Sequence, residues 1–382
     1  MWYMNEDRQI LVNAFREFAQ NEVRPAAAKM EENEEFPLEA IKKLGELGML
    51  SFCVDEELGG AGMDYVTKGL LIEELSKESH GFALLTHLQT ELTTCAIAPV
   101  CTPEQIERFV KPAMAGEILL GIGFTEPTGA NNMFEYEANA VMDGDEVVIN
   151  GGKILITACD KADYIITCVR TGEFDPATMS GVTMVAIPTN AEGYVVGHME
   201  KKLGWKGSHT GQVYFNNIRV PKENLIGGWN GGVVPVLAVI NQAHTVYGPM
   251  NLGAMEACFD KTLNYLKNRV QCGVSLWDAH EVIRNEMARL HVKITNYRYA
   301  VYSALEERNR GADYATVEAL AIALKVAGEE LLAEVAGQCI EFQGGMGTVY
   351  ETGIERYYRD GKMGALGCGS NKALINTLST ML

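Results

Sequence analysis

The side chains best suited to chemistry lie in three short stretches of this chain. In "THLQTELTTCAIAP", His87 and Glu91 are four residues apart and would share one face of a helix. In "NQAHTVYGPMNLG", His244 is of the type that titrates nearest neutrality, and Tyr247, one helical turn later, can donate a hydrogen bond. In "GALGCGSNKAL", the thiol of Cys368 has an ordinary pKa of about 8.5 and forms a thiolate beside a positive group. Residues of these types are suited to moving a proton.

Each of these residues also has an ordinary interpretation without chemistry. Glu91 is compatible with a solvated carboxylate on a helix surface, because most glutamates are exposed. Cys368 is compatible with a small, inert thiol that fills space. The residue types alone leave both alternatives open.

Hydrophobic periodicity divides the chain into three parts. Residues 1–118 carry apolar side chains at helical spacing and predict an N-terminal helical domain. Residues 119–230 are rich in β-branched residues and turn glycines, and "MDGDEVVING" predicts a hairpin with "DGD" as its turn. Residues 231–382 return to long helical patterns, which predict a C-terminal helical bundle. The fold class is therefore a multi-domain α+β protein, and this order rules out a doubly wound sheet.

The composition excludes several classes of protein. The chain has 382 residues and a formal net charge of -18, which argues against a broad nucleic-acid surface, although a local basic pocket remains compatible with it. Nine cysteines are scattered without a CxxC pair or a Cys/His cluster at metal-binding spacing. We therefore expect no metal site and no disulfide framework.

Membrane insertion and secretion are also not expected. No segment approaches the roughly 18 uninterrupted apolar residues that a membrane-spanning helix needs. The first residues, "MWYMNEDRQILVNAFREFAQNEV", carry acidic groups and lack a basic start followed by an apolar run, unlike a signal peptide. The sequence thus predicts a cytoplasmic location.

Five longer motifs occur in order along the chain. They are "GFTEPTGANN" at 123–132, "NGGKILITACDKADYIIT" at 150–167, "EKKLGWKGSHTGQVYFNNIRVPKENLIG" at 200–227, "NRVQCG" at 268–273 and "QGGMGTVYETGIERYYRD" at 343–360. In this order and at this spacing they resemble the acyl-CoA dehydrogenase family. The resemblance covers nearly the whole chain.

The resemblance implies a flavoprotein that binds FAD and an acyl-CoA thioester. Its three domains would be an N-terminal helical domain, a middle β-barrel-like domain and a C-terminal four-helix bundle, usually assembled as a homotetramer. A carboxylate removes the α-proton of the thioester while the β-hydride passes to the flavin, and an electron-transfer flavoprotein takes the electrons. Hydrogen bonds to the thioester carbonyl stabilise the developing enolate.

The resemblance also assigns residues to the cofactor. Thr125 and Thr157 match threonines beside the flavin ring, where a hydroxyl can both donate and accept a hydrogen bond. Arg269 matches the arginine that reaches the FAD pyrophosphate, a role that suits a guanidinium fork. Gly344 and Gly345 match paired glycines that let the backbone approach the cofactor of a neighbouring subunit.

The family's usual catalytic carboxylate is missing from its place. After "RD" at 359–360 the family continues to "EGT", whose glutamate is the usual base. Counting forward without a gap places Cys368 at that glutamate and Ser370 at the threonine, which implies cofactor contact for Ser370. Cys368 is therefore the first candidate to replace the base, as a thiolate.

A second position for the base is also empty of a carboxylate. Some members supply the glutamate from an earlier helix, ten residues before a glycine and just before an arginine. Counting back from Gly253 places Ala243 at that glutamate and His244 at the arginine, which lies near the CoA. His244 is thus a candidate for proton transfer or for ligand contact, and Tyr247 for a hydrogen bond to the substrate.

Glu91 is the third candidate for proton chemistry. Its stretch aligns with the helix that lines the acyl cavity and that normally carries small or neutral residues. A carboxylate there predicts a relocated base or a partner for a positive group on an unusual acyl chain. His87, at i−4, would share this substrate-facing position.

Three functions follow from the resemblance and its departures. The first is a flavoenzyme that dehydrogenates an acyl-CoA, reduces an enoyl-CoA, or eliminates an activated β-substituent without net oxidation. The second is a non-catalytic or half-site subunit that completes its site in a heterotetramer with a paralogue. The third is a flavin-dependent hydroxylase or oxidase on a substrate without CoA. We expect the first, acting through Glu91, Cys368 or His244.

Overall fold

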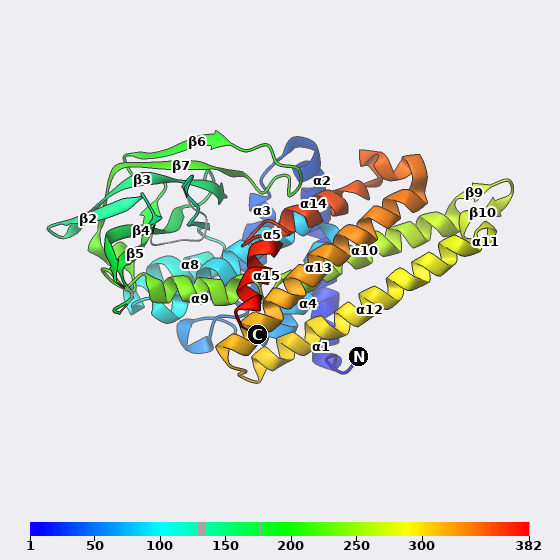
Figure 1. Cartoon of the computed structure of the whole chain (residues 1–382), viewed down its shortest axis with the longest axis horizontal. Coiled ribbons are helices and arrows are strands. Elements are labelled where there is room, and N and C mark those ends of the chain that lie inside the picture. Colours follow the sequence, from blue (N-terminus) through cyan, green and yellow to red (C-terminus); the bar gives the residue numbers. More distant parts are fainter. Residues whose placement is uncertain (129–134, 176, 382) are drawn as a thin grey trace.

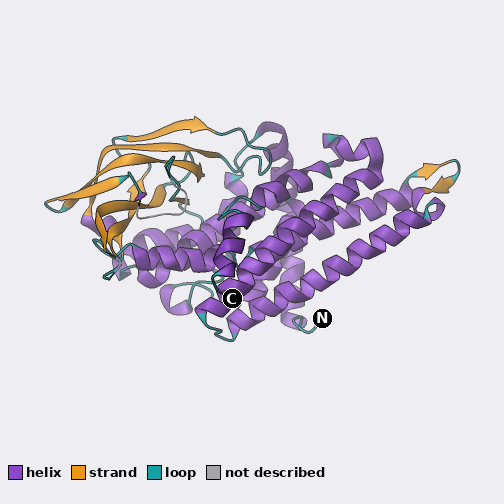
Figure 2. Ribbon diagram, in the orientation of Figure 1, coloured by secondary structure: helices purple, strands orange, loops and turns teal. Residues whose placement is uncertain are grey.

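The computed structural model describes residues 1–128, 135–175 and 177–381. A helical N-terminal domain, a middle β-domain and a helical C-terminal domain follow one another along the chain, as Figures 1 and 2 show. The predicted α+β fold class is confirmed. The "GANN" end of the first motif, residues 129–132, lies outside the described residues.

The N-terminal domain begins with α-helices of 9 to 14 residues and ends with α-helices of three or four residues. Asn5 caps α1 by accepting from the backbone N–H of Arg8, and Asp64 caps α4 by accepting from that of Thr67. The helices are α1 (Glu6–Phe18), α2 (Arg24–Asn33), α3 (Leu38–Glu46), α4 (Tyr65–Glu78), α5 (His80–Gln89), α6 (Cys95–Ile97), α7 (Pro103–Gln105) and α8 (Lys111–Met114). A π-helical turn over Thr90–Thr94 follows α5 directly. Such turns often occur at functional sites, and this one contains Glu91.

The middle domain is an eight-stranded sheet in the order β6-β7-β3-β2-β4-β5-β8, with β1 paired to β4. The predicted hairpin joins β2 to β3, with Asp143 opposite Glu146 and Gly144 in the turn at a φ of 65°. The strands are β1 (Leu120–Gly123), β2 (Asn139–Asp143), β3 (Glu146–Thr157), β4 (Tyr164–Asp175), β5 (Ser180–Pro188), β6 (Tyr194–Met199), β7 (Thr210–Pro221) and β8 (Leu225–Ile226).

Three long helices dominate the C-terminal domain and run along the length of the molecule in Figure 1. Its elements are α9 (Val233–Ala243), α10 (Tyr247–Asn268), β9 (Val270–Gln271), β10 (Val274–Ser275), α11 (Leu276–Ala279), α12 (Glu281–Asn309), α13 (Tyr314–Gln343), α14 (Glu355–Gly364) and α15 (Asn371–Ser379). The long helices α10, α12 and α13 pack on one another, and α4 of the N-terminal domain packs on α10 and α12. The core therefore continues from the first domain into the last.

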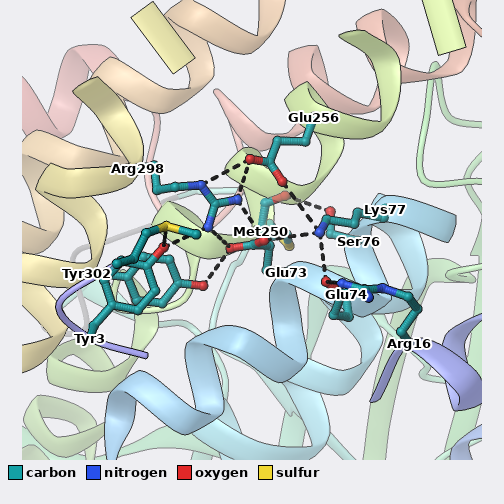
Figure 3. A network of polar contacts seen from close by, with 11 residues as sticks. Tyr3, Arg16, Glu73, Glu74, Ser76, Lys77, Met250, Glu256, Arg298 and Tyr302 are labelled. Carbon is teal, nitrogen blue, oxygen red and sulfur yellow. Dashed lines mark hydrogen bonds and ion pairs between the residues drawn. The ribbon is translucent and has the colours of Figure 1, made fainter. Parts of the chain in front are cut away.

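A buried ion cluster fastens α4 to the C-terminal helices (Figure 3). Arg298 of α12 donates to Glu73 of α4 at 2.8 Å and also pairs with Glu256 of α10. The hydroxyl of Tyr302 donates to Glu73 at 2.5 Å, and Ser76 donates to the carbonyl of Met250 at 2.6 Å. Because these polar groups have partners, burying them is tolerated.

Candidate active site

Cys368 lies in the turn that joins α14 to α15. Its φ is 48°, a left-handed value that side chains other than glycine rarely adopt, and Gly369 follows at 90°. Ser370 then caps α15, its hydroxyl accepting from the N–H of Ala373 at 3.3 Å. The turn thus fixes Cys368 in an unfavourable backbone conformation, a kind of strain that clusters at functional sites.

His87 and Glu91 form the pair that their spacing predicts. The Nδ1 atom of His87 lies 3.1 Å from Oε2 of Glu91, and neither residue is exposed to solvent. The Nε2 atom of His87 lies 3.1 Å from the carbonyl oxygen of Ala243. Since a carboxylate and a carbonyl only accept hydrogen bonds, both ring nitrogens must carry a proton. His87 is therefore an imidazolium ion.

Electrostatics agree with this protonation state. Burial would lower the pKa of His87, but hydrogen bonds with Cys368 and Glu91 raise it to about 9. Burial would likewise raise the pKa of Glu91, but Lys68, His87 and Thr90 lower it to about 2. The Nζ atom of Lys68 lies 3.4 Å from Oε1 of Glu91, and Thr90 donates to Oε2 at 2.5 Å. The interpretation of Glu91 as a solvated carboxylate is therefore wrong.

His244 approaches Cys368 from the break between α9 and α10. Its Nε2 atom lies 2.9 Å from the carbonyl oxygen of Cys368, and its Nδ1 atom lies 3.0 Å from Oε1 of Glu318 on α13. Two histidine–glutamate pairs, one from each helical domain, thus converge on the turn at Cys368.

The thiol of Cys368 is half-buried and faces positive groups. Burial raises its pKa, but the interaction with His87, the nearby Tyr247 hydroxyl and His244 lower it to about 7. The nearby Lys325 also interacts electrostatically with Cys368. A large fraction of Cys368 is therefore thiolate near neutral pH.

Tyr247 lies beneath this turn with its hydroxyl directed at it. The side chain is fully buried, and its ring meets that of His87 edge-on, with 5.9 Å between centroids. A Cβ on Gly367 would lie 3.2 Å from the Tyr247 hydroxyl. Within the described ranges, that hydroxyl makes no hydrogen bond that meets the geometric criteria. Tyr247 thus holds a donor that a ligand could use.

Lys325 of α13 holds the turn in place. Its Nζ atom donates to the carbonyls of Gly364 and Gly369 at 3.0 and 3.1 Å and lies 4.8 Å from the Tyr247 ring centroid. One helical turn away, burial raises the pKa of Glu329 to about 8, in spite of Lys325. Glu329 is therefore mostly uncharged at neutral pH.

The sequence interpretation missed Lys68, Glu318 and Lys325. The signal for two of them was present: Lys68 in "TKGLLIEEL" and Lys325 in "LAIALKVAG" interrupt apolar runs. A lysine that is buried in such a run needs an acceptor nearby. Glu318 gave no comparable signal, because it lies near the start of α13 like many solvated helix glutamates.

The predicted flavin threonines lie in the middle domain, close to α5. The carbonyl of Thr125 accepts from the N–H of Ile154 at 2.9 Å, and Thr157 pairs with Thr210 across β3 and β7. Gln89, at the end of α5, exchanges two hydrogen bonds with the backbone of Leu120 on β1. The π-helical turn that contains Glu91 is thus attached to the sheet that presents these threonines.

The predicted pyrophosphate residues lie at the other end of the molecule. Arg269 ends α10 and lines a cavity of about 420 Å³ together with Gln343, the residue before Gly344. A Cβ on Gly344 or Gly345 would meet nothing within 4 Å, so a ligand can approach this backbone. Figure 1 shows β9, which follows Arg269 directly, at the opposite end of the long axis from the sheet. Within one chain, the two groups of predicted cofactor residues therefore lie far apart.

The "ERYYRD" run at 355–360 makes ion pairs and hydrogen bonds to residues far away in the sequence. Arg359 pairs with Glu31 at 2.7 Å and with Glu355 at 3.0 Å, and Arg356 donates to the carbonyl of Glu78. Asp360 accepts from the N–H of Trp205 at 2.6 Å. These bonds tie α14 to both other domains.

Neither a membrane-spanning helix nor a metal-binding cluster occurs in the part of the chain that the structure describes. No helix there is long and apolar enough to cross a membrane. No group of three or more His, Cys, Asp or Glu side chains in those same residues is arranged to hold a metal ion.

Three family models match consecutive parts of the chain. They are the acyl-CoA dehydrogenase N-terminal domain over residues 5–117, the middle domain over 121–218 and the C-terminal domain over 230–382. The matched residues follow the three structural domains.

Curated relatives match over almost the full length. The chain is 32% identical over 360 residues to the short-chain specific acyl-CoA dehydrogenase of Clostridium acetobutylicum, covering 94% of this chain and 93% of that one. It is 28% identical to the human mitochondrial short-chain specific enzyme, covering 94% and 85%.

Solved structures share the fold. Butyryl-CoA dehydrogenase from Megasphaera elsdenii superposes with a TM-score of 0.90 at 25% identity, covering 99% of this chain and 98% of that one. A glutaryl-coenzyme A dehydrogenase in complex with glutaryl-CoA gives a TM-score of 0.88 at 25% identity, covering 98% and 95%.

Proposed function

The chain belongs to the acyl-CoA dehydrogenase family, and on that premise we propose that it is an FAD-dependent oxidoreductase acting at the α and β carbons of an acyl-CoA. The observation that carries the proposal is the match of all three domains in order, with butyryl- and glutaryl-CoA dehydrogenases among the similar structures. Dehydrogenation and enoyl-CoA reduction are the two directions of this reaction.

Thr125, Thr157 and Arg269 are the residues proposed to hold FAD. When bound, FAD supplies the acceptor for the β-hydride. The hydroxyls of Thr125 and Thr157 would contact the ring, and the Arg269 guanidinium suits a diphosphate. The open space over Gly344 and Gly345 supports close approach of a cofactor to the backbone. Because one chain separates these groups, each cofactor would lie between two chains, as in a homotetramer.

We assign the α-proton to Cys368. Its thiolate is favoured by His87 and His244, and a pKa of about 7 matches a base that works near neutrality. Glu91 is a poor base, because its pKa is about 2 and because Lys68, Thr90 and His87 bind its oxygens. We assign Glu91 to orienting His87 and keeping it charged. Tyr247 is proposed to donate a hydrogen bond to the thioester.

The separated cofactor residues also favour a second candidate, a half-site subunit. A paralogue in place of a second copy could supply the missing half of each FAD site. The partners in either case are an acyl-CoA and, as electron acceptor, an electron-transfer flavoprotein. Elimination of an activated β-substituent would use the same thiolate without electron transfer.

The colour of the purified chain separates the two candidates. We expect a yellow protein whose flavin spectrum is bleached by an acyl-CoA without oxygen. A chain that is colourless alone and yellow only when co-expressed with a paralogue would favour the half-site subunit. Cys368→Ser should slow bleaching by about a hundredfold or more while keeping the flavin spectrum. Unchanged bleaching in this variant would remove Cys368 from proton transfer.

A further inference from the structure

We propose that Cys368 is also a nucleophile, which accepts the acyl group of a CoA thioester as a covalent thioester on its own sulfur. The inference rests on the proposed function only in taking the same acyl-CoA as its ligand. It adds an activity that needs no flavin and no electron acceptor.

The three residues of a nucleophile–base–orienter array are in place. Glu91 binds Nδ1 of His87 at 3.1 Å, Nε2 of the same ring lies 3.1 Å from the carbonyl oxygen of Ala243, and His87 interacts with the Cys368 thiol and lowers its pKa. Thiol nucleophiles are activated by this arrangement, in which a carboxylate orients a histidine beside the sulfur. Lys68 keeps Glu91 in place from its far side. Lys68 is therefore a positioning residue for the array.

The backbone around Cys368 also fits a nucleophile. The left-handed φ of 48° places Cys368 at a sharp turn between α14 and α15, two residues before the N-cap Ser370. A strained turn that presents the nucleophile is also a feature of the nucleophile elbow, where it joins a strand to a helix. Cys368 is a half-buried residue, whereas His87 and Glu91 are fully buried. The histidine is thus shielded from bulk water.

Tyr247 supplies an independent indication of a ligand. Its hydroxyl is fully buried, is directed at the turn at Gly367 and, among the described residues, has no hydrogen bond of acceptable geometry. A buried hydroxyl without a partner is costly in a folded protein. An oxyanion formed at the thioester carbonyl would provide the missing acceptor.

The chemistry balances without an added oxidant or reductant. The thiolate of Cys368 bonds to the thioester carbon, and the carbonyl oxygen becomes an oxyanion that accepts from Tyr247. The carbon–sulfur bond to CoA then breaks, and the CoA thiolate takes the proton from Nε2 of His87. One thioester is exchanged for another, and neutral His87 remains to activate a later acceptor such as water.

The test is to incubate the purified holoprotein with acetyl-, butyryl-, octanoyl- and palmitoyl-CoA and to quench in acid. We expect one of them to add the mass of one acyl group to the intact protein and to release an equal amount of CoA. Peptide mapping should place the group on Cys368, and neutral hydroxylamine should remove it. If a later acceptor takes the group quickly, release of CoA will continue beyond one equivalent.

Matched variants test Cys368 as the acylated residue and the contributions of His87 and Tyr247 to acylation. Cys368→Ser and Cys368→Ala should lose both the adduct and the CoA release, whereas Cys272→Ser, which alters an exposed thiol, should keep both. His87→Gln should slow acylation by about a hundredfold. Tyr247→Phe should slow it by a similar factor of about a hundred. The flavin spectrum of each variant reports whether it has folded.

Two results would overturn the inference. One is the absence of both adduct and CoA release with all four thioesters, and the other is an adduct that survives in both Cys368 variants. Flavin bleaching by the same thioesters distinguishes this failure from failure of the proposed oxidation. Bleaching without acylation rejects only the nucleophile, and acylation without bleaching rejects only the oxidation.

Discussion

Two buried clusters of charged residues join the N-terminal domain to the C-terminal helices, and they differ in how completely their groups are paired. Around Arg298, Glu73 binds Arg298 and Tyr302, while Lys77 binds Glu73, Glu74 and Glu256 (Figure 3). Around Cys368, the buried atoms that have no hydrogen-bond partner among the described residues include Tyr247 Oη, Glu318 Oε2 and both carboxylate oxygens of Glu329, while Lys68 Nζ and Glu91 Oε1 have only their mutual ion pair at 3.4 Å.

This difference separates a structural role from a functional one. A paired cluster holds elements together, whereas unpaired buried groups cost stability and need another reason to be present. The strained backbone of Cys368 adds to this cost. We therefore expect changes in the Arg298 cluster to affect stability more than chemistry, and changes in the Cys368 cluster to do the reverse.

The largest effect is expected for Arg298→Met. It leaves the Glu73 and Glu256 carboxylates buried without their shared partner, which typically costs about 3–5 kcal/mol of stability. Urea unfolding followed by circular dichroism measures this loss. Arg289→Met, at an exposed helix position, is the matched control and should leave the midpoint unchanged. Equal midpoints for the two variants would contradict a structural role for Arg298.

Glu91→Gln tests both properties in the second cluster. It leaves Lys68 as a buried, unpaired cation and should cost about 3 kcal/mol of stability. Turnover of the folded protein should also fall, by about a hundredfold, because His87 loses its charged partner.

The double variant Lys68→Met, Glu91→Gln separates these effects. Removing both charges should restore most of the stability but none of the turnover, because the buried cation is gone while His87 still lacks its carboxylate. Recovery of turnover together with stability would show that Glu91 acts only through folding.

Turnover should have a bell-shaped pH profile. The thiolate of Cys368 forms as pH rises through about 7, so the rate should rise up to tenfold per pH unit below that value. His87 loses its proton as pH rises through about 9, and the rate should fall there. The charged groups that face the thiolate, from three helices, are His87, His244 and Lys325. A rate that stays flat between pH 6 and about 8 would contradict the assignment.

The stability of the protein should also depend on pH through His87 and Glu91, in opposite directions. The pKa of His87 is raised from 6.5 to about 9, so its contribution is complete below pH 6.5 and is lost as pH rises through 9. The pKa of Glu91 is lowered from 4.5 to about 2, so its contribution is present above pH 4.5 and is lost as pH falls through 2. Denaturation midpoints measured across pH report both losses of stability. Glu91→Gln should remove the loss at low pH that arises from this site.

The smallest effect is expected for Ser370→Ala. Loss of the cap on α15 should cost about 1 kcal/mol, without loss of the flavin spectrum. Thr377→Ala, an exposed hydroxyl in the same helix, is the control and should change little. Loss of flavin from Ser370→Ala, but not from Thr377→Ala, would support the sequence prediction that Ser370 contacts the cofactor.

Local patterns predicted the domains and one part of the site. The order of helical, β and helical parts followed from periodicity, because the spacing of apolar residues along the chain differs between a helix and a strand. The β2–β3 hairpin followed from "DGD" for the same reason. The His87–Glu91 pair followed from a spacing of four residues on one helix, although the bond is made where α5 passes into a π-helical turn.

The sequence by itself therefore determined the three domains, the residue types at the site and the one pair that is local in the chain. Only the tertiary structure decided what these residues face. His244 meets the Cys368 carbonyl across 124 residues and His87 meets Ala243 across 156, contacts that depend on how α5, α9 and α13 pack. That packing also places Lys68 against Glu91, so Glu91 is suited to being a counterion and not a base.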